Sequence, residues 1–248
     1  MSFEWHPLLL CTEHSEFDAG AERVAFHLAR QLRVPLAAVL PYLGNEELAE
    51  AAPELAARND EDAGERADAV EQAAADAGVV DLRLEVRSGP ELHVEILDEA
   101  VRVGARLIVT RRRGKVGFLK RLEVGEMVGQ LVAQAPCSVL VVPRLVGPWQ
   151  NGVMVVTQGA PDVQLEDAAQ AAARVAGAAL HVHALDASAS PPASADGIVA
   201  AARDAGCDLI VIARSASNAA ASSWIGGIAH KVVGLAECAV LVHVPTSR

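Results

Sequence analysis

The sequence predicts an α/β protein made of two tandem, doubly wound domains with parallel sheets, the second domain shorter than the first. Short aliphatic strand segments alternate with amphipathic helical segments, which is the pattern of parallel strands joined by crossover helices. This pattern occurs twice along the 248 residues. The aliphatic runs are too short to span a bilayer, so we expect a globular protein outside the membrane.

The duplication is visible in two pairs of aligned segments. Ala105–Arg111 aligns with Cys207–Ala213 at an offset of 102 residues. Ala135–Val141 aligns with Ala236–Val242 at an offset of 101. A repeat of this length indicates a duplicated domain, because solenoid units have only about 20–50 residues.

The second copy is shorter because it lacks one internal piece. Ala29–Leu36 aligns with Ala173–Leu180 at an offset of 144, so about 42 residues of the first copy have no counterpart. We therefore expect a first domain over residues 1–146 and a shortened second domain over residues 147–248. Gly147–Trp149 marks the linker.

Five strands are expected in the first copy, with helices between them. The strands are Leu8–Thr12, Leu36–Leu40, Leu82–Val86, Arg106–Thr110 and Ser138–Val142. Ser15 with Asp18 is a variant of the capping box and predicts the start of the first helix. That helix has one apolar face, formed by Phe17, Ala21, Val24, Leu28 and Leu32. Later helices are expected within Gly44–Gly78, interrupted at Pro53 and Gly64, and over Glu91–Val103 and Val124–Ala135.

The second copy keeps most of these elements. Its expected segments are Val153–Thr157, Leu165–Ala176, Ala179–Leu185, Asp196–Ala205, Asp208–Ala213, Gly227–Ala236 and Ala239–Val244. It has no counterpart of the third strand or of the helix before it. In a flavodoxin-like or Rossmann-like strand order the third strand lies at an edge, so its deletion leaves the other strands paired. We expect Ala187–Ala195 to be the short loop that replaces it.

Charge and cysteine usage exclude some classes of function. The net charge of −11 argues against a general nucleic-acid binder. Gly44–Gly78 holds eleven acids against two arginines, whereas Arg111–Arg121 holds six cations and no acid. The four cysteines include no CxxC pair and the N-terminus shows no export signal, so we expect buried, reduced thiols and a cytoplasmic protein.

Three features of the chain resemble the universal stress protein family. They are a Ser-Glu turn after the first strand, the strand Leu107–Val109 leading into a basic loop with glycines, and the final strand of the first copy, Ala135–Val142. The resemblance covers nearly the whole chain and implies a Rossmann-like fold of the HUP type. Nucleotide-binding members of that family carry Gly-x2-Gly-x9-Gly-(Ser/Thr/Asn) after the fourth strand and an Asp after the first. Such glycines let backbone amides approach phosphates.

The first copy matches this nucleotide-binding pattern only in part. Arg111 stands at the first glycine position and Gly114 at the second. Ten residues instead of nine then precede Gly125, and Glu126 replaces the hydroxyl residue, where a carboxylate repels phosphate. Glu13 stands where the family has Asp, and it keeps the charge on a longer side chain.

The basic loop of the first copy has two interpretations, which the sequence leaves open. It could bind phosphate or another anion through Arg111, Arg112, Arg113 and Lys115 together with Gly114 and Gly117. It could instead be solvated, or its arginines could pair with the acidic helix of the same chain.

The second copy is expected to be a degenerate site. Ala213 and Ala216 replace the first two glycines, although the nine-residue spacing to Gly226 is kept. Gly227 replaces the hydroxyl residue, and Thr157 or the residue after it replaces the acid.

Other candidate chemistry is weak. His181 and His183 share one strand face, yet no third metal ligand with suitable spacing is evident. Hydrolase and kinase motifs are absent from the sequence. Trp149 and Trp224 lie in linker and loop, where an aromatic ring either joins domains or has no role.

Two hypotheses follow from these observations. The first is a stress-response interaction protein that has lost nucleotide binding, needs no cofactor and is not an enzyme. Its two copies would pair through their last strands as an intramolecular pseudo-dimer, with a further homodimer and an unknown protein partner, and without membrane or nucleic-acid contacts. The alternative is a sensor that binds ATP, another adenine nucleotide or an anion in the first domain only, through Glu13, Gly114, Gly117 and Gly125.

Overall fold

The computed structural model describes residues 4–44, 50–112, 125–158, 161–185, 191–214 and 227–245. The strands are β1 (Leu8–Cys11), β2 (Leu36–Leu43), β3 (Leu82–Gly89), β4 (Leu107–Arg111), β5 (Ser138–Val142), β6 (Gly152–Thr157), β7 (Ala179–Ala184), β8 (Leu209–Ala213) and β9 (Ala239–His243). The helices are α1 (Ala19–Leu32), α3 (Pro53–Asp76), α4 (Leu92–Val103), α5 (Glu126–Gln134), α6 (Val163–Ala176), α7 (Pro191–Asp204) and α8 (Ile228–Leu235).

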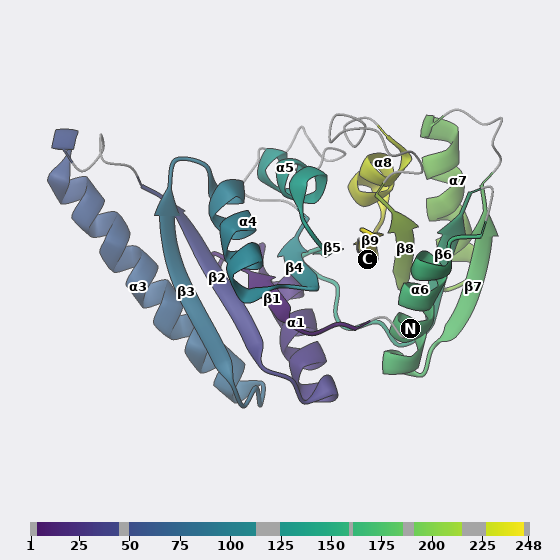
Figure 1. Ribbon diagram of the computed structural model, residues 1–248, viewed down its shortest axis with the longest axis horizontal. Helices are drawn as coiled ribbons and strands as arrows, with labels where there is room; N and C mark the ends of the chain where they lie inside the picture. Colours follow the sequence, from purple (N-terminus) through teal and green to yellow (C-terminus); the bar gives the residue numbers. More distant parts are fainter. Residues whose placement is uncertain are drawn as a thin grey trace.

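The described strands form one sheet of nine strands in the order β3-β2-β1-β4-β5-β9-β8-β6-β7 (Figure 1). Each copy is parallel within itself, and the doubly wound α/β class is confirmed. β3 lies at one edge, as expected for the element that the second copy lacks. At the opposite edge of the sheet lies β7, the second copy's counterpart of β2.

The two copies meet in the middle of the sheet, where β5 and β9 pair antiparallel. Leu140 pairs with Leu241, its own counterpart at the offset of 101 residues. Val139 pairs with Val242 and Val141 with Val240, and these two pairs exchange under the repeat. The register is therefore centred on a pseudo-two-fold axis through Leu140 and Leu241.

Helices cover both faces of the sheet, because the strand side chains alternate between two apolar clusters. One cluster packs alternate strand residues, such as Leu9 and Ile210, against α4, α5, α7 and α8. The other packs their neighbours, such as Leu8 and Leu209, against α1, α6 and the end of α3. Both clusters run through the two copies, so the core is continuous. Among the described helices, none has the length and apolar character needed to cross a membrane.

The first helix has the expected buried face but starts later than expected. Ala21, Val24 and Leu28 are almost fully buried. Residues 15–18 form a turn, and α1 begins at Ala19. The predicted contacts between Ser15 and Asp18 form in this turn, because the N–H of Ser15 donates to Asp18 Oδ2 at 3.0 Å and the N–H of Phe17 donates to Ser15 Oγ at 3.3 Å. Asp18 makes no side-chain hydrogen bond to the N-terminus of α1, so the helix starts later than predicted. Its carboxylate is turned to an arginine instead, as described below.

Two other expected boundaries are corrected by the structure. Pro53 interrupts the helical segment as expected, because residues 50–51 are helical, Ala52 is not and α3 begins at Pro53. Gly64, however, lies within α3 instead of ending it. α7 begins at Pro191, so residues 191–195 are helical and not part of a loop. Residues 186–190 lie outside the described part of the chain.

The linker is held by one tryptophan. Trp149 is 3% exposed, and its ring stacks on Trp5 with the ring centroids 6.0 Å apart. Its indole N–H donates a hydrogen bond of 2.9 Å to the carbonyl oxygen of Ala172 in α6. Trp149 therefore joins the segment before β1 to the second copy. Trp224 lies outside the described residues.

Candidate functional site

The candidate site lies at the carboxyl ends of β1 and β4. β1 pairs with β2 on one side and with β4 on the other, so the winding direction reverses between β1 and β4. In open α/β sheets ligands bind at this point, because the loops after the two strands diverge to opposite faces and leave a crevice. The loop of residues 12–18 follows β1, and Arg111 is the last residue of β4.

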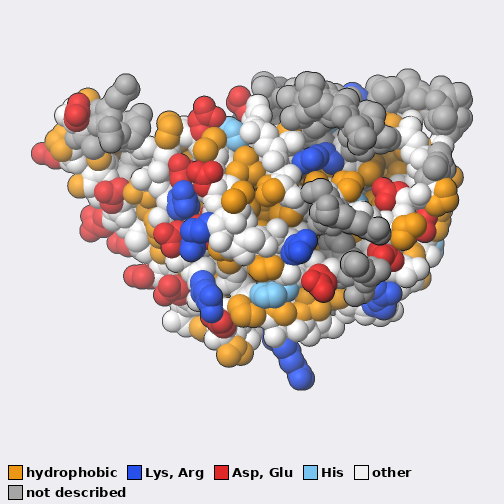
Figure 2. Space-filling view, in the orientation of Figure 1, with side chains coloured by type: hydrophobic (Ala, Val, Ile, Leu, Met, Phe, Trp, Pro, Cys, Tyr) orange, Lys and Arg blue, Asp and Glu red, His pale blue; other side chains and the backbone are white. Residues whose placement is uncertain are grey.

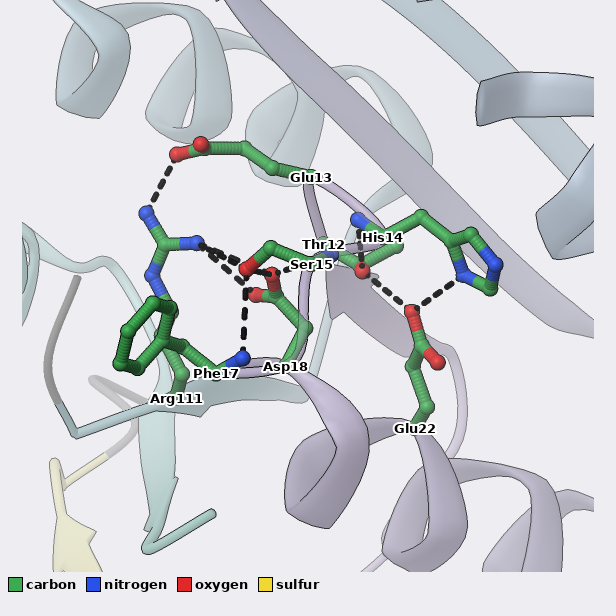
Figure 3. Close-up of polar contacts among 8 residues, drawn as sticks. All are labelled: Thr12, Glu13, His14, Ser15, Phe17, Asp18, Glu22 and Arg111. Carbon is green, nitrogen blue, oxygen red and sulfur yellow. Dashed lines mark hydrogen bonds and ion pairs between the residues drawn. The ribbon is translucent and has the colours of Figure 1, made fainter. Parts of the chain in front are cut away.

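The side chain of Arg111 enters this crevice and is bound by two carboxylates (Figure 3). Its Nη1 donates to Asp18 Oδ2 at 2.9 Å and to Asp18 Oδ1 at 3.2 Å, and lies 3.4 Å from Ser15 Oγ. Its Nη2 donates to Glu13 Oε1. The side chains of Arg111 and Asp18 are only 8% and 2% exposed, so this is a largely buried cluster in which two carboxylates share one guanidinium.

The charge of Arg111 is stabilised by these contacts. Burial alone lowers the pKa of Arg111, but the carboxylates of Asp18 and Glu13 raise it, and the net shift is upward. Ser15 supports the cluster, because its backbone N–H and its hydroxyl both donate to Asp18 Oδ2, at 3.0 and 2.5 Å. Arg111 is therefore a permanent cation whose donors are directed at acids of the same chain.

A second set of hydrogen bonds holds the loop that carries Glu13. Glu22 Oε1 accepts from the hydroxyl of Thr12 at 2.6 Å and lies 3.0 Å from His14 Nδ1. The backbone N–H of His14 donates to the Thr12 hydroxyl at 2.9 Å. His14 has φ 50°, a left-handed conformation that costs free energy for a residue other than glycine. These bonds keep the loop in the shape that presents Glu13 to Arg111.

The interpretation of the basic loop as solvated or paired with the acidic helix does not describe its first cation. Arg111 is not solvated, and it does not pair with the acidic helix α3. Its partners are Glu13 and Asp18, which come from the β1–α1 loop. Gly114 and Gly117, and the cations Arg113 and Lys115, lie outside the described residues.

Gly125 and Glu126 lie where α5 begins. Gly125 precedes the helix, and its N–H donates to the carbonyl of Arg112 at 3.5 Å. Glu126 is exposed in the first turn, where a carboxylate complements the helix dipole. This negative charge lies at the helix end to which a phosphate would otherwise bind.

The second arginine after β4 binds the other copy. Arg112 donates from Nη1 to the carbonyl oxygen of Ala236, at the C-terminal end of α8. Arg214, its counterpart at the offset of 102, donates from Nη1 to the carbonyl of Ala135 at the end of α5, at 2.8 Å. Ala135 and Ala236 are themselves counterparts. Each copy thus places one arginine on a helix C-terminus of the other copy, where a cation complements the helix dipole.

Among its described residues, the equivalent crevice of the second copy has no such arginine cluster. Ala213 stands at the position of Arg111, and the strand registers place Gln158 at that of Glu13. Asp162, the counterpart of Asp18, accepts hydrogen bonds from the backbone N–H groups of Gln164 and Leu165, both at 3.1 Å. It therefore caps α6. Ala216 and Gly226 lie outside the described residues.

The sequence identified Glu13 and Arg111 as site residues but not the remaining members of the cluster. Asp18 was interpreted only as part of a helix start, and Thr12, His14 and Glu22 had no assigned role. A signal for Asp18 existed, because the repeat aligns it with Asp162 while Arg111 aligns with an alanine. The aspartate occurs in both copies, whereas the arginine occurs only in the first. The aspartate must therefore bind a different partner in each copy.

The remaining candidate groups show no reactive arrangement. The thiols of Cys11, Cys137 and Cys207 are buried, that of Cys238 is half-buried, and all four are free, as expected for a reduced protein. His181 and His183 are half-buried on one face of β7. No group of three or more His, Cys, Asp or Glu with metal-binding geometry occurs among the described residues.

Comparisons with known proteins agree on one family and one fold. A model of the Universal stress protein family matches residues 4–143 and 151–245. A protein of unknown function from Pseudomonas aeruginosa PAO1 has 17% identity and a TM-score of 0.73, over 96% of this chain and 92% of that chain. A universal stress protein from Archaeoglobus fulgidus DSM 4304 has 16% identity and a TM-score of 0.67, over 95% of both chains.

A third solved structure, a putative universal stress protein from Pseudomonas aeruginosa UCBPP-PA14, has 18% identity and a TM-score of 0.65. The match covers 90% of this chain and 87% of that chain. At these identities the solved structures establish the fold alone. A search of curated proteins returned no match.

Proposed function

The chain belongs to the universal stress protein family, and from this premise we propose that it is a stress-response interaction module whose ligand crevice is occupied by its own arginine. In this proposal the nucleotide-binding motifs of both copies are degenerate, no cofactor is bound and no reaction is catalysed. The module acts through protein contacts in the cytoplasm, which accords with its four free cysteines.

The observation that carries the proposal is the position of Arg111. Its guanidinium lies between β1 and β4 and is bound by Glu13 and Asp18. A phosphate entering this crevice would have to break both ion pairs and would then approach two carboxylates. The exposed Glu126 adds a third carboxylate at the start of α5. Because two carboxylates already share the one guanidinium, the cluster has one negative charge in excess and offers an anion little attraction.

The proposal that the two copies act as an intramolecular pseudo-dimer rests on their central contact. β5 and β9 pair in a register centred on equivalent leucines, and Arg112 and Arg214 make reciprocal contacts to helix ends. Such self-complementary contacts are the mark of an isologous interface. The duplication then holds together two domains that would otherwise have to find each other in solution.

The thiols support the proposal that the protein is not an enzyme. Burial raises the pKa of Cys11, Cys137 and Cys238 to about 12. A thiol reacts as a nucleophile in its thiolate form, which is almost absent at neutral pH when the pKa is this high. These cysteines therefore act as core residues.

Calorimetric titration with ATP, ADP and AMP, together with mass spectrometry of the purified protein, tests the proposal. We expect no heat of binding and no copurified nucleotide. The alternative, a nucleotide sensor in the first domain, requires micromolar or tighter binding that is abolished by Gly114→Val. That result would overturn the proposal.

A pair of arginine variants tests the role given to Arg111. Arg111→Gly removes the guanidinium from the crevice, whereas Arg83→Gly removes an arginine whose side chain is 78% exposed on β3. If Arg111 closes the crevice, weak nucleotide binding is expected only in Arg111→Gly, and neither in the unchanged protein nor in Arg83→Gly. Binding by the unchanged protein and by both variants alike would show that Arg111 has no such role.

A further inference from the structure

The two edges of the sheet are protected to very different degrees. β3 carries three charged side chains, Arg83, Glu85 and Arg87, and is packed against α3. Charged residues and covering helices are the usual means of keeping an edge strand from pairing with another chain. β7, with the sequence Ala-Leu-His-Val-His-Ala, has no Lys, Arg, Asp, Glu or Pro, and within the described structure it pairs only with β6.

The backbone of β7 presents a regular set of hydrogen-bonding groups at its free side. The N–H of Ala179 donates to the carbonyl oxygen of Asn151, just before β6, and the N–H of Leu185 donates to the carbonyl oxygen of Thr157 at the end of β6. In a parallel pair alternate residues bond to the same neighbour, so the odd-numbered residues face β6. The N–H and C=O groups of Leu180, Val182 and Ala184 therefore point away from the sheet, toward the free edge.

The side chains of these same residues are exposed because the second copy has no counterpart of α3 to cover them. Leu180 is 37% exposed and Val182 is 68% exposed. Their counterparts in the first copy, Leu36 and Ala38, are fully buried in the cluster that contains Ala74 of α3. The deletion that shortened the second copy thus left an apolar strip beside an open strand edge.

We propose that β7 pairs antiparallel with β7 of a second copy of this chain, which makes the protein a homodimer with one sheet continuing across both chains. A two-fold axis perpendicular to the sheet at Val182 places Val182 opposite Val182 of the second copy. It also places Leu180 opposite Ala184. All three residues with outward-pointing backbone groups then form hydrogen-bonded pairs, and their apolar side chains cover one another on the same face.

The distribution of charge favours this arrangement over others. Residues 1–146 carry a formal charge of −8 and residues 147–248 only −3. Figure 2 shows acidic side chains gathered over the end of the molecule that carries α3, and Figure 1 places β7 at the opposite end. Contact through β7 keeps the two acidic ends far apart. Pairing of β3 with β3 of another copy would bring them together, and pairing of β7 with β3 would extend as an open chain.

The molar mass of the protein, measured by light scattering as it elutes from a size-exclusion column, tests the proposal. Concentrations up to about 100 μM populate a weak dimer. We expect twice the chain mass of 25.9 kDa. Val182→Lys should return the mass to that of one chain, because it places two like charges opposite each other. The matched control is Val101→Lys on α4, since Val101 is also 68% exposed; it should leave the dimer intact.

A cross-link tests the register without depending on a charged variant. In the proposed dimer the two Val182 Cα atoms lie about 5.5 Å apart, within the range that a disulfide spans. Val182→Cys should therefore form a covalent dimer on mild oxidation, whereas Val101→Cys should not. A single-chain mass for the unchanged protein, a dimer that survives Val182→Lys, assemblies larger than two chains, or no cross-link at residue 182 would each overturn the proposal.

Discussion

The crevices of the two copies contain the same aspartate in two different roles. In the first copy Asp18 is 1% exposed and binds the guanidinium of Arg111, and it makes no cap at the N-terminus of α1. In the second copy Asp162 has no arginine beside it and caps α6 through two backbone N–H groups. The cation decides the role, because a buried guanidinium needs a carboxylate more than a helix end with access to water does.

Among the variants that test these two roles, Arg111→Ala is expected to lower the stability of the protein most. The variant leaves the buried Asp18 and the partly buried Glu13 without a cation, so the free energy of unfolding should fall by about 3–5 kcal/mol. Urea unfolding followed by circular dichroism measures it. Arg83→Ala, at a side chain that is 78% exposed, should change the stability by less than about 0.5 kcal/mol.

A double variant tests whether Asp18 takes the role of Asp162 once its arginine is removed. Glu13→Gln with Arg111→Ala gives the first crevice the residues of the second, Gln158 and Ala213. Asp18 is then free to cap its helix, so the double variant should lose less stability than Arg111→Ala alone, a non-additive result. Equal or greater loss would mean that Asp18 does not change roles.

A smaller effect is expected from replacing the aspartate itself in each copy. Asp18→Asn removes the charge that pairs with Arg111 and should cost about 2 kcal/mol. Asp162→Asn should cost less than about 0.5 kcal/mol, because asparagine caps a helix about as well as aspartate does. The two variants are compared by urea unfolding, and equal losses would contradict the two assigned roles.

The contact between the copies should have a smaller effect again. Arg214→Gln removes the cation from the end of α5 and should cost about 1 kcal/mol. Arg203→Gln, at a side chain that is 74% exposed, is the control and should change little. Thermal unfolding of both variants measures the difference, and an unchanged Arg214→Gln protein would show that this arginine does not join the copies.

The smallest effect is a pH dependence at the same contact. His243 is 2% exposed in β9, and its Nδ1 lies 3.2 Å from the hydroxyl of Ser138 in β5. Burial lowers the pKa of His243 below 6.5, although Asp162 opposes the shift. As the pH falls below 6.5 the unfolded chain therefore takes up the proton first, so stability present above this pH is lost on acidification.

His243→Gln should make this loss shallower between pH 7.5 and 5.5. The change in slope is limited to about 1.4 kcal/mol per pH unit, the value for one proton. His27 and His230, whose pKa values burial also lowers, contribute equally to both proteins. Urea unfolding across this pH range gives both slopes, and parallel curves would rule out His243 as the titrating group.

Strand positions were largely predictable, and helix boundaries less so. Ser138–Val142 was predicted as it occurs, because a continuous aliphatic run bounded by turn residues has few alternatives. Gly64 was predicted to interrupt a helix but lies within α3, since glycine in an exposed helix interior costs only about 1 kcal/mol and neighbouring turns outweigh it. The edge position of β3 was predicted because the second copy lacks a counterpart of this strand, and only an edge strand can be lost without separating the others.

The sequence by itself determined that the chain is a duplicated α/β fold, that the second copy is shortened and that alanines stand at two glycine positions of its loop. These properties follow from local periodicity and from the repeat. Only the tertiary structure decided where Arg111 and Arg112 point. Arg111 meets Asp18 across 93 positions of sequence and Arg112 meets Ala236 across 124, and such partners are chosen by burial and charge after the sheet has formed.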